Sequence, residues 1–121
     1  MAELKQRRIL YTAEDLADKV KEIGRKISQD YAGKDLIVVG VLKGSLYFFA
    51  DLTRAIDVPI GTDVIAIGNI QNTTSQTGIV RITKDLDLDI TGKHVLVIED
   101  IIRTGLTTAY LVQNLDVRKP A

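Results

Sequence analysis

The sequence of 121 residues contains no cysteine, which excludes a disulfide framework, thiolate metal sites and a cysteine nucleophile. It has a single histidine, His94, so a metal site built from several histidines is also excluded. There are only two prolines, and 45% of the residues are hydrophobic, which argues against disorder and low-complexity tracts. A chain of 13.3 kDa has the size of one domain, so we predict a single domain over residues 1–121.

A net charge of one sign is also lacking. Sixteen lysine and arginine residues balance sixteen aspartate and glutamate residues, so no overall field attracts nucleic acid or anionic lipid. No stretch approaches the run of about 18 apolar residues that a membrane span needs. The N-terminus is charged where a signal peptide would be apolar. These absences predict a cytoplasmic protein with neither a nucleic-acid nor a membrane partner.

Patterns typical of strands and helices alternate along the chain. Residues 9–11 predict a short strand, and Thr12 with Asp15 predicts the capped start of a helix that runs to about Asp30. The apolar run 36–42 is typical of a strand that is buried on both faces of a parallel sheet. Ser45 is placed to cap the helix that follows.

The second half of the chain continues this alternation. Its apolar runs predict strands over residues 64–67, 79–82 and 95–98, the last of them fully buried, and a final helix over 107–115. The polar stretch 69–77 predicts a loop. Aspartate alternates with leucine or isoleucine over 85–90, which is typical of a half-exposed strand edge. Together these patterns predict an α/β domain with a mostly parallel sheet.

The stretch 97–108 carries the residues best suited to chemistry. A predicted strand ends at Glu99 and Asp100, and a turn containing Thr104 and Gly105 opens the last helix. Backbone N–H groups at a helix start, together with threonine hydroxyls, suit a phosphate monoester. The two carboxylates could hold a sugar diol or Mg²⁺. The same pattern is equally compatible with threonine caps and a solvated strand end.

This stretch resembles the phosphoribosyl-diphosphate (PRPP) binding motif of type I phosphoribosyltransferases, in which two acidic residues and a Thr-Gly-x-Thr phosphate loop follow an apolar strand. Residues 41–45, Val-Leu-Lys-Gly-Ser, resemble the pyrophosphate loop of the hypoxanthine-guanine branch, and residues 84–87 and 92–95 match that branch too. The resemblance covers about residues 9–120. It implies a Rossmann-like α/β fold in three layers, with a mostly parallel twisted sheet and flanking helices.

The resemblance also implies which residues hold the ligand. Those implied to bind the ribose and its 5′-phosphate are Glu99, Asp100, Thr104, Gly105, Leu106 and Thr107. Those implied to bind pyrophosphate are Leu42, Lys43 and Gly44, often with a cis peptide between the first two. Glu99 and Asp100 would also hold Mg²⁺. The implied ligands are PRPP and a purine nucleoside monophosphate or phosphate.

The implied activity is transfer of phosphoribosyl from PRPP to hypoxanthine or guanine, giving a nucleoside monophosphate and pyrophosphate. The sequence departs from the family in three ways. Asn69 and Ile70 stand where the family has a Ser-Tyr pair that closes over PRPP and pyrophosphate, so closure should be weaker. Arg103 stands where the family has an aspartate, the presumed general base, and a guanidinium cannot accept that proton. The chain ends at Ala121, where the family continues into a further strand and the residues that read the purine.

Three functions therefore stay open. The chain is a purine phosphoribosyltransferase, a catalytically inactive truncated or engineered core that binds PRPP, nucleotide or phosphate only, or a self-associating scaffold. Arg103 is either an extra positive charge beside the phosphate or a surface arginine. Because a strand of the family's sheet would be missing, its exposed edge predicts a homodimer or a larger assembly.

Overall fold

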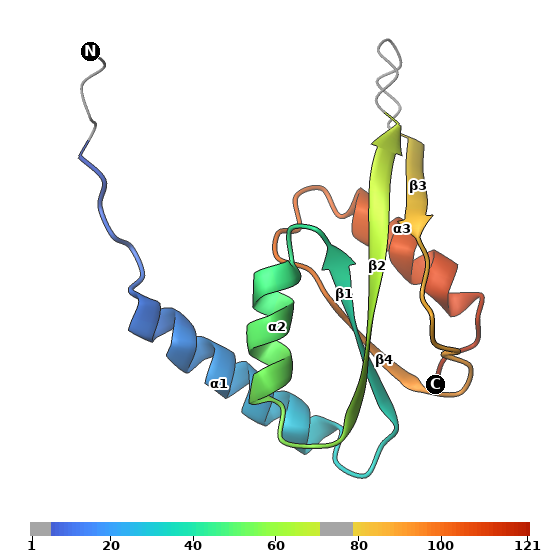
Figure 1. Cartoon of the computed structure of the whole chain (residues 1–121), viewed down its shortest axis with the longest axis horizontal. Coiled ribbons are helices and arrows are strands. Elements are labelled where there is room, and N and C mark those ends of the chain that lie inside the picture. The colour runs from blue at the N-terminus through green and yellow to red at the C-terminus, as the bar shows by residue number, and fades with distance from the viewer. Residues whose placement is uncertain (1–5, 71–78) are drawn as a thin grey trace.

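A twisted four-stranded sheet forms the centre of the molecule in a computed structural model that describes residues 6–70 and 79–121 (Figure 1). Its strands are β1 (Leu36–Leu42), β2 (Ile60–Ile70), β3 (Ile79–Lys84) and β4 (His94–Ile98), in the order β3-β2-β1-β4. The helices are α1 (Ala13–Asp30), α2 (Leu46–Ala55) and α3 (Leu106–Asp116). β1 is parallel to β2 and β4, and only β3 is antiparallel to its neighbour. The predicted α/β class and mostly parallel sheet are confirmed.

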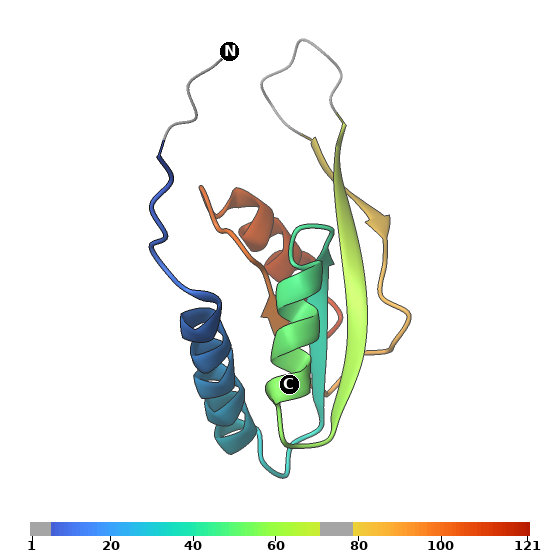
Figure 2. The same ribbon diagram turned by 60° about the vertical axis from the view of Figure 1, so that its left-hand side comes forward.

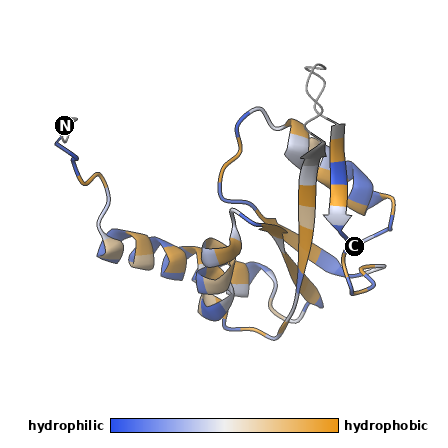
Figure 3. Ribbon diagram, turned by 45° about the horizontal axis from the view of Figure 1, so that its top comes forward, coloured by the Kyte–Doolittle hydropathy of each residue, from blue (hydrophilic) through white to orange (hydrophobic). Residues whose placement is uncertain are grey.

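Helices cover both faces of this sheet, which confirms the three layers (Figure 2). On one face, Ile27 of α1 and Leu52 of α2 pack with Val38 of β1. On the other face, Leu111 of α3 packs with Ile37 of β1. Successive residues of a strand point to opposite faces, so the apolar run in β1 serves both cores. Hydrophobic residues accordingly run along the central strands, whereas both kinds of residue alternate along α1 (Figure 3). None of the described helices is long and apolar enough to cross a membrane.

The predicted start of α1 is confirmed, but the strand predicted just before it is wrong. The Thr12 hydroxyl accepts the Asp15 N–H at 3.0 Å, and the Asp15 carboxylate accepts the Thr12 N–H at 2.9 Å. These hydrogen bonds to Thr12 lower the pKa of Asp15. Residues 9–11 are irregular, and all three side chains are exposed. No described strand lies beside them to supply backbone partners, so their β-prone composition has no sheet to join.

Strand pairing changes two of the other predictions. β2 extends well beyond the predicted residues 64–67 because β1 pairs with its first half and β3 with its second. Asn69 and Ile70, predicted to begin a loop, therefore belong to β2, and residues 71–77 of that prediction lie outside the described residues. β4 is not fully buried: only Ile98 is, because β4 forms an edge of the sheet.

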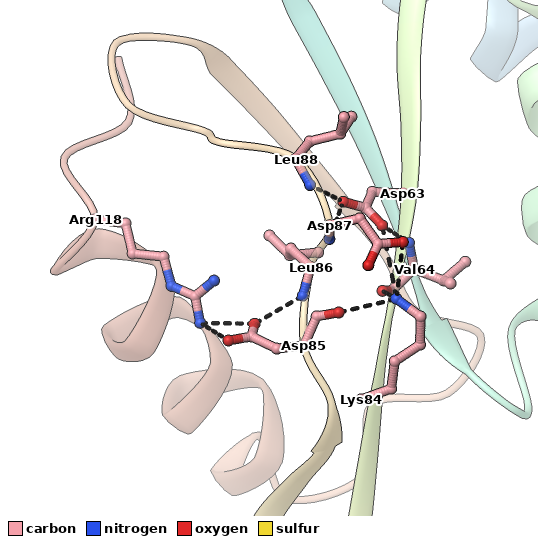
Figure 4. Close-up of polar contacts among 8 residues, drawn as sticks. All are labelled: Asp63, Val64, Lys84, Asp85, Leu86, Asp87, Leu88 and Arg118. Carbon is pink, nitrogen blue, oxygen red and sulfur yellow. Dashed lines mark hydrogen bonds and ion pairs between the residues drawn. The ribbon is translucent and has the colours of Figure 1, made fainter.

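The segment 85–93 connects β3 to β4 without forming a strand, so the predicted strand edge is wrong. Asp63 of β2, only 7% exposed, holds this segment (Figure 4). Its carboxylate accepts the backbone N–H groups of Asp87 and Leu88, both at 2.9 Å. The Lys84 ammonium lies 3.9 Å from Asp63 and 3.5 Å from the Asp87 carboxylate. N–H groups that a strand would offer to a neighbouring strand are bound here by a side chain.

Arg118 ties the chain beyond α3 to the same segment (Figure 4). One guanidinium nitrogen lies 2.8 Å and 3.0 Å from the two carboxylate oxygens of Asp85 and donates to the Asn114 side chain at 2.9 Å. Burial by itself would raise the pKa of Asp85. The hydrogen bonds from Arg118 and from the Leu86 N–H, with the nearby positive charges, outweigh burial and lower that pKa.

Replacing Arg118 with alanine should reduce the free energy of unfolding at pH 7 by about 1 kcal/mol or less, since the pair is partly exposed. Asp85 has its ordinary pKa of 3.8 in the unfolded chain and a lower one in the folded chain. Its contribution is therefore present above that value and is lost as the pH falls through the folded pKa. Urea denaturation at pH 7 and in strong acid should show the difference between parent and Arg118→Ala closing in acid. A difference of equal size at both pH values would contradict this account, and Arg25→Ala, an exposed arginine on α1, controls for loss of a positive charge.

Candidate functional site

The candidate site lies where β1 and β4 end. The two strands are parallel neighbours, so the loops that follow them emerge at the same edge of the sheet (Figure 1). The turn 43–45 leads from β1 into α2, and the segment 99–105 leads from β4 into α3. A methyl group on Gly44 would lie 3.0 Å and 3.2 Å from the carboxylate oxygens of Asp100. The two loops therefore touch, although 56 residues separate Gly44 from Asp100 in the numbering (100 − 44).

The turn after β1 is closed by a serine hydroxyl. Ser45 is fully buried, and its hydroxyl donates to the Val41 carbonyl. The predicted side-chain cap on α2 is wrong, because Ser45 has helical backbone angles, φ −81° and ψ −2°, instead of the extended ones of a capping residue. The peptide between Leu42 and Lys43 is cis, as the resemblance implied. Lys43 and Gly44 are exposed, which leaves this turn accessible to a ligand.

Two adjacent carboxylates follow β4. Glu99 is half-buried and Asp100 is exposed, and the Asp100 N–H donates to Glu99 Oε1 at 3.0 Å. Burial raises the pKa of Glu99, and the neighbouring Asp100 carboxyl raises it further, although the Asp100 N–H opposes both effects. A cation or a pair of sugar hydroxyls placed beside these carboxylates would relieve their repulsion.

A cavity of about 280 Å³ lies between the segment 99–105 and the first turn of α3. Gly105 precedes the helix with a φ of 82°, a left-handed conformation that glycine adopts readily. The Thr104 hydroxyl accepts the Leu106 N–H at 3.3 Å, whereas N–H groups of a first helical turn have no acceptor within the helix. Such N–H groups and the threonine hydroxyls suit an anion. The cavity is lined by Glu99, Ile101, Ile102, Arg103, Thr104, Gly105, Thr107 and Thr108.

The structure brings together most of the residues that the resemblance assigns to PRPP. Four of the six ribose and phosphate residues line the cavity, namely Glu99, Thr104, Gly105 and Thr107. Asp100 lies against Gly44, so it faces the predicted pyrophosphate turn. Leu106 is 74% exposed and does not line the cavity, and its N–H donates to the Thr104 hydroxyl. The sequence did not predict that Ile101 and Ile102 line the cavity. The one feature that could have indicated it is a pair of apolar residues in an otherwise polar loop.

Magnesium would have two protein ligands at this site. Within residues 6–70 and 79–121, no three histidine, aspartate or glutamate side chains gather in a group that could hold a metal. Mg²⁺ is usually bound by one or two carboxylates together with water and substrate phosphates. Glu99 and Asp100 therefore fit an ion that arrives with a phosphate ligand, and they do not form a metal cage by themselves.

Comparison with known proteins agrees with this geometry. Residues 6–121 match the family described as phosphoribosyl transferase domain, so the chain belongs to that family. Within it, the chain is 42% identical to the hypoxanthine-guanine phosphoribosyltransferase of Mycobacterium avium over 118 residues, which are 93% of this chain and 58% of the relative. The corresponding protein of Dictyostelium discoideum is 41% identical over 118 residues, 94% of this chain and 66% of the relative.

Solved structures give the same result. A crystal structure of a hypoxanthine-guanine phosphoribosyltransferase from Bacillus anthracis superimposes with a TM-score of 0.84 at 39% identity, covering 97% of this chain and 67% of that one. A hypoxanthine phosphoribosyltransferase from Staphylococcus aureus gives 0.86 at 38% identity, covering 98% and 67%. The resemblance to the hypoxanthine-guanine branch is confirmed. The chain spans 58% of the length of the first curated relatives it matches.

Replacing Gly105 with alanine should weaken phosphate binding through the backbone. A Cβ at Gly105 would have no neighbour within 4 Å, so its cost, about 1–2 kcal/mol, comes from the left-handed φ alone. Relief of that strain would turn the first N–H groups of α3 away from the cavity. Titration calorimetry with ribose 5-phosphate should show binding weakened about tenfold, the equivalent of about 1.4 kcal/mol.

Gly33 offers a matched control for this substitution. Its φ is 75° and a Cβ there would also have no neighbour within 4 Å, but it lies between α1 and β1, away from the cavity. Gly33→Ala should lose a similar free energy of unfolding and keep the parental affinity for ribose 5-phosphate. Equal affinity in the Gly105 and Gly33 variants would remove the start of α3 from the phosphate site.

Proposed function

We propose that this chain acts as a purine phosphoribosyltransferase, which transfers phosphoribosyl from PRPP to hypoxanthine or guanine. The observation that carries the proposal is the contact between Gly44 and Asp100 beside the cavity at the start of α3. PRPP presents a pyrophosphate, a ribose diol and a 5′-phosphate close together. The turn 43–45, the acidic pair and the start of α3 offer a partner for each of these groups. The names of the relatives, hypoxanthine-guanine phosphoribosyltransferases, support the same activity.

In this proposal the start of α3 orients the ligand. The first-turn N–H groups, with Thr104, Gly105 and Thr107, bind the 5′-phosphate. Glu99 and Asp100 accept hydrogen bonds from the ribose hydroxyls and hold Mg²⁺. When bound, Mg²⁺ neutralises charge on the pyrophosphate leaving group. The ribose is thereby held between a basic and an acidic end, which fixes its direction in the site.

The turn after β1 serves the leaving group. Leu42, Lys43 and Gly44 bind the pyrophosphate, whose negative charge grows as its bond to the ribose C1′ breaks. A purine ring nitrogen forms the new bond to C1′ and loses its proton to solvent. Arg103 does not take that proton, because a guanidinium has no acceptor. The reaction in this chain therefore depends on positioning and charge stabilisation.

Incubation of the chain with PRPP, Mg²⁺ and hypoxanthine or guanine should release pyrophosphate and form the nucleoside monophosphate. We expect slow turnover, since general-base catalysis is worth about 10²–10⁴-fold and Arg103 cannot supply it. Gly44→Ala should lower the rate further, by about tenfold, because its Cβ would lie 3.0 Å from Asp100 and the misplaced groups lose their alignment. A coupled pyrophosphate assay measures both effects.

Gly61→Ala is the control for the Gly44 variant, because a Cβ on Gly61 would make only an ordinary contact, 3.4 Å from Ile37. It should keep the parental rate. Absence of purine-dependent pyrophosphate release from the parent chain would overturn the proposed activity. Equal rates in the Gly44 and Gly61 variants would remove the turn after β1 from it.

We also propose that copies of the chain associate through the β4 side of the sheet. No described strand pairs with the outer edge of β4, and four of its five residues are only half-buried. Next to it, Ile101 and Ile102 are 64% and 63% exposed. An open edge with apolar neighbours favours pairing with another chain.

Light scattering over a range of protein concentrations should therefore give the mass of a homodimer or a larger assembly. The physical reason is that backbone N–H and C=O groups on an open edge gain partners when two chains meet. A single-chain mass at the highest concentration, with a cooperative thermal transition, would show that the sheet is stable with this edge open and would rule out the association.

A further inference from the structure

Arg103 is the one cation among the residues that line the cavity at the start of α3. It comes from the helix side of the segment 99–105, two residues before Gly105, whereas Glu99 comes from the strand side. The positive end of the α3 dipole lies on the same side as Arg103. The cavity thus has an acidic end at β4 and a basic end at α3.

The guanidinium of Arg103 has no carboxylate partner within residues 6–70 and 79–121. By contrast, Arg54 lies 2.6 Å from Asp51 and Arg118 lies 2.8 Å from Asp85. Glu99 and Asp100 are near in sequence, yet neither forms an ion pair with Arg103 in the described part of the chain. Arg103 is exposed, so its planar set of five N–H donors is available to a ligand.

We infer that Arg103 is a phosphate-binding residue of this site and makes it selective for ligands that carry a phosphate dianion. The inference rests on the proposed function, because it places the ligand's phosphate in the same cavity. A guanidinium binds phosphate oxygens in pairs, and such charge-assisted hydrogen bonds are about twice as strong as neutral ones. Arg103 adds such bonds to the N–H groups of α3, while Glu99 and Asp100 repel an anion from the other end. Because Arg103 stands where the family has an aspartate, this chain lacks a proton acceptor at that position and has a phosphate-binding group instead.

The test is titration calorimetry of ribose 5-phosphate into the 121-residue chain and three variants. Arg103→Gln should bind about tenfold more weakly than the parent. Arg103→Lys should recover part of the loss, because an ammonium keeps the charge but not the planar donor set. Arg25→Gln, an exposed arginine on α1, changes the net charge equally and should stay within about twofold of the parent. The parent's affinity should also fall more steeply with added salt than that of Arg103→Gln.

Parental affinity in Arg103→Gln would overturn the inference, and so would an equal loss in Arg25→Gln, which would reduce the effect to net charge. Failure of the parent to bind ribose 5-phosphate would overturn it too. The outcome is separable from that of the proposed activity. Binding that depends on Arg103 without pyrophosphate release would contradict the activity and leave the inference standing. Pyrophosphate release by the parent, together with parental affinity for ribose 5-phosphate in Arg103→Gln, would support the activity and overturn the inference.

Discussion

The parallel pairing of β1 with both β2 and β4 is the constraint on which the site depends. β1 is hydrogen-bonded to a strand on each side and packed by helices on both faces. The positions and directions of β2 and β4 are therefore restricted by their pairing with β1. Because β1 and β4 run in the same direction, the loops that follow them meet at one edge of the sheet. The contact of Gly44 with Asp100 is the direct result of that geometry. A phosphate-rich ligand can be held there by two loops that are distant in sequence.

The charges of the chain cancel overall but are separated within the site. Sixteen positive and sixteen negative residues leave no net field, yet Glu99 and Asp100 stand at the end of β4, whereas Arg103 and the start of α3 supply positive potential. In the proposed function, this separation over one short segment orients the sugar phosphate. Arg103 has opposite consequences for the two steps of the proposed reaction, because a permanent cation strengthens phosphate binding and cannot assist proton removal.

Beside the first half of β2, a side chain binds the backbone N–H groups of the segment 85–93, which forms no strand. This explains why the sequence pattern of that segment was misleading. The alternation of aspartate and leucine over 85–90 is the period expected for a strand. In the folded chain Asp63 binds the N–H groups of Asp87 and Leu88. Arg118 binds Asp85 of the same segment. An alternation of polar and apolar residues indicates which side chains face inward and which face outward. It does not indicate whether a second strand is present to pair with the backbone.

The sequence by itself determined the features that depend on neighbouring residues: the run that became β1, the Thr12–Asp15 cap of α1, and the acidic pair and Gly105 that bracket the cavity segment. Their signals are local, since apolar periodicity, a cap between residues three positions apart and a left-handed glycine are properties of short stretches. The tertiary structure alone decided the length of β2, the half-buried state of β4 at the sheet edge, and the joining of the two site loops. Each of these depends on which segments become neighbours in space, and partners up to dozens of residues away are invisible to a local pattern.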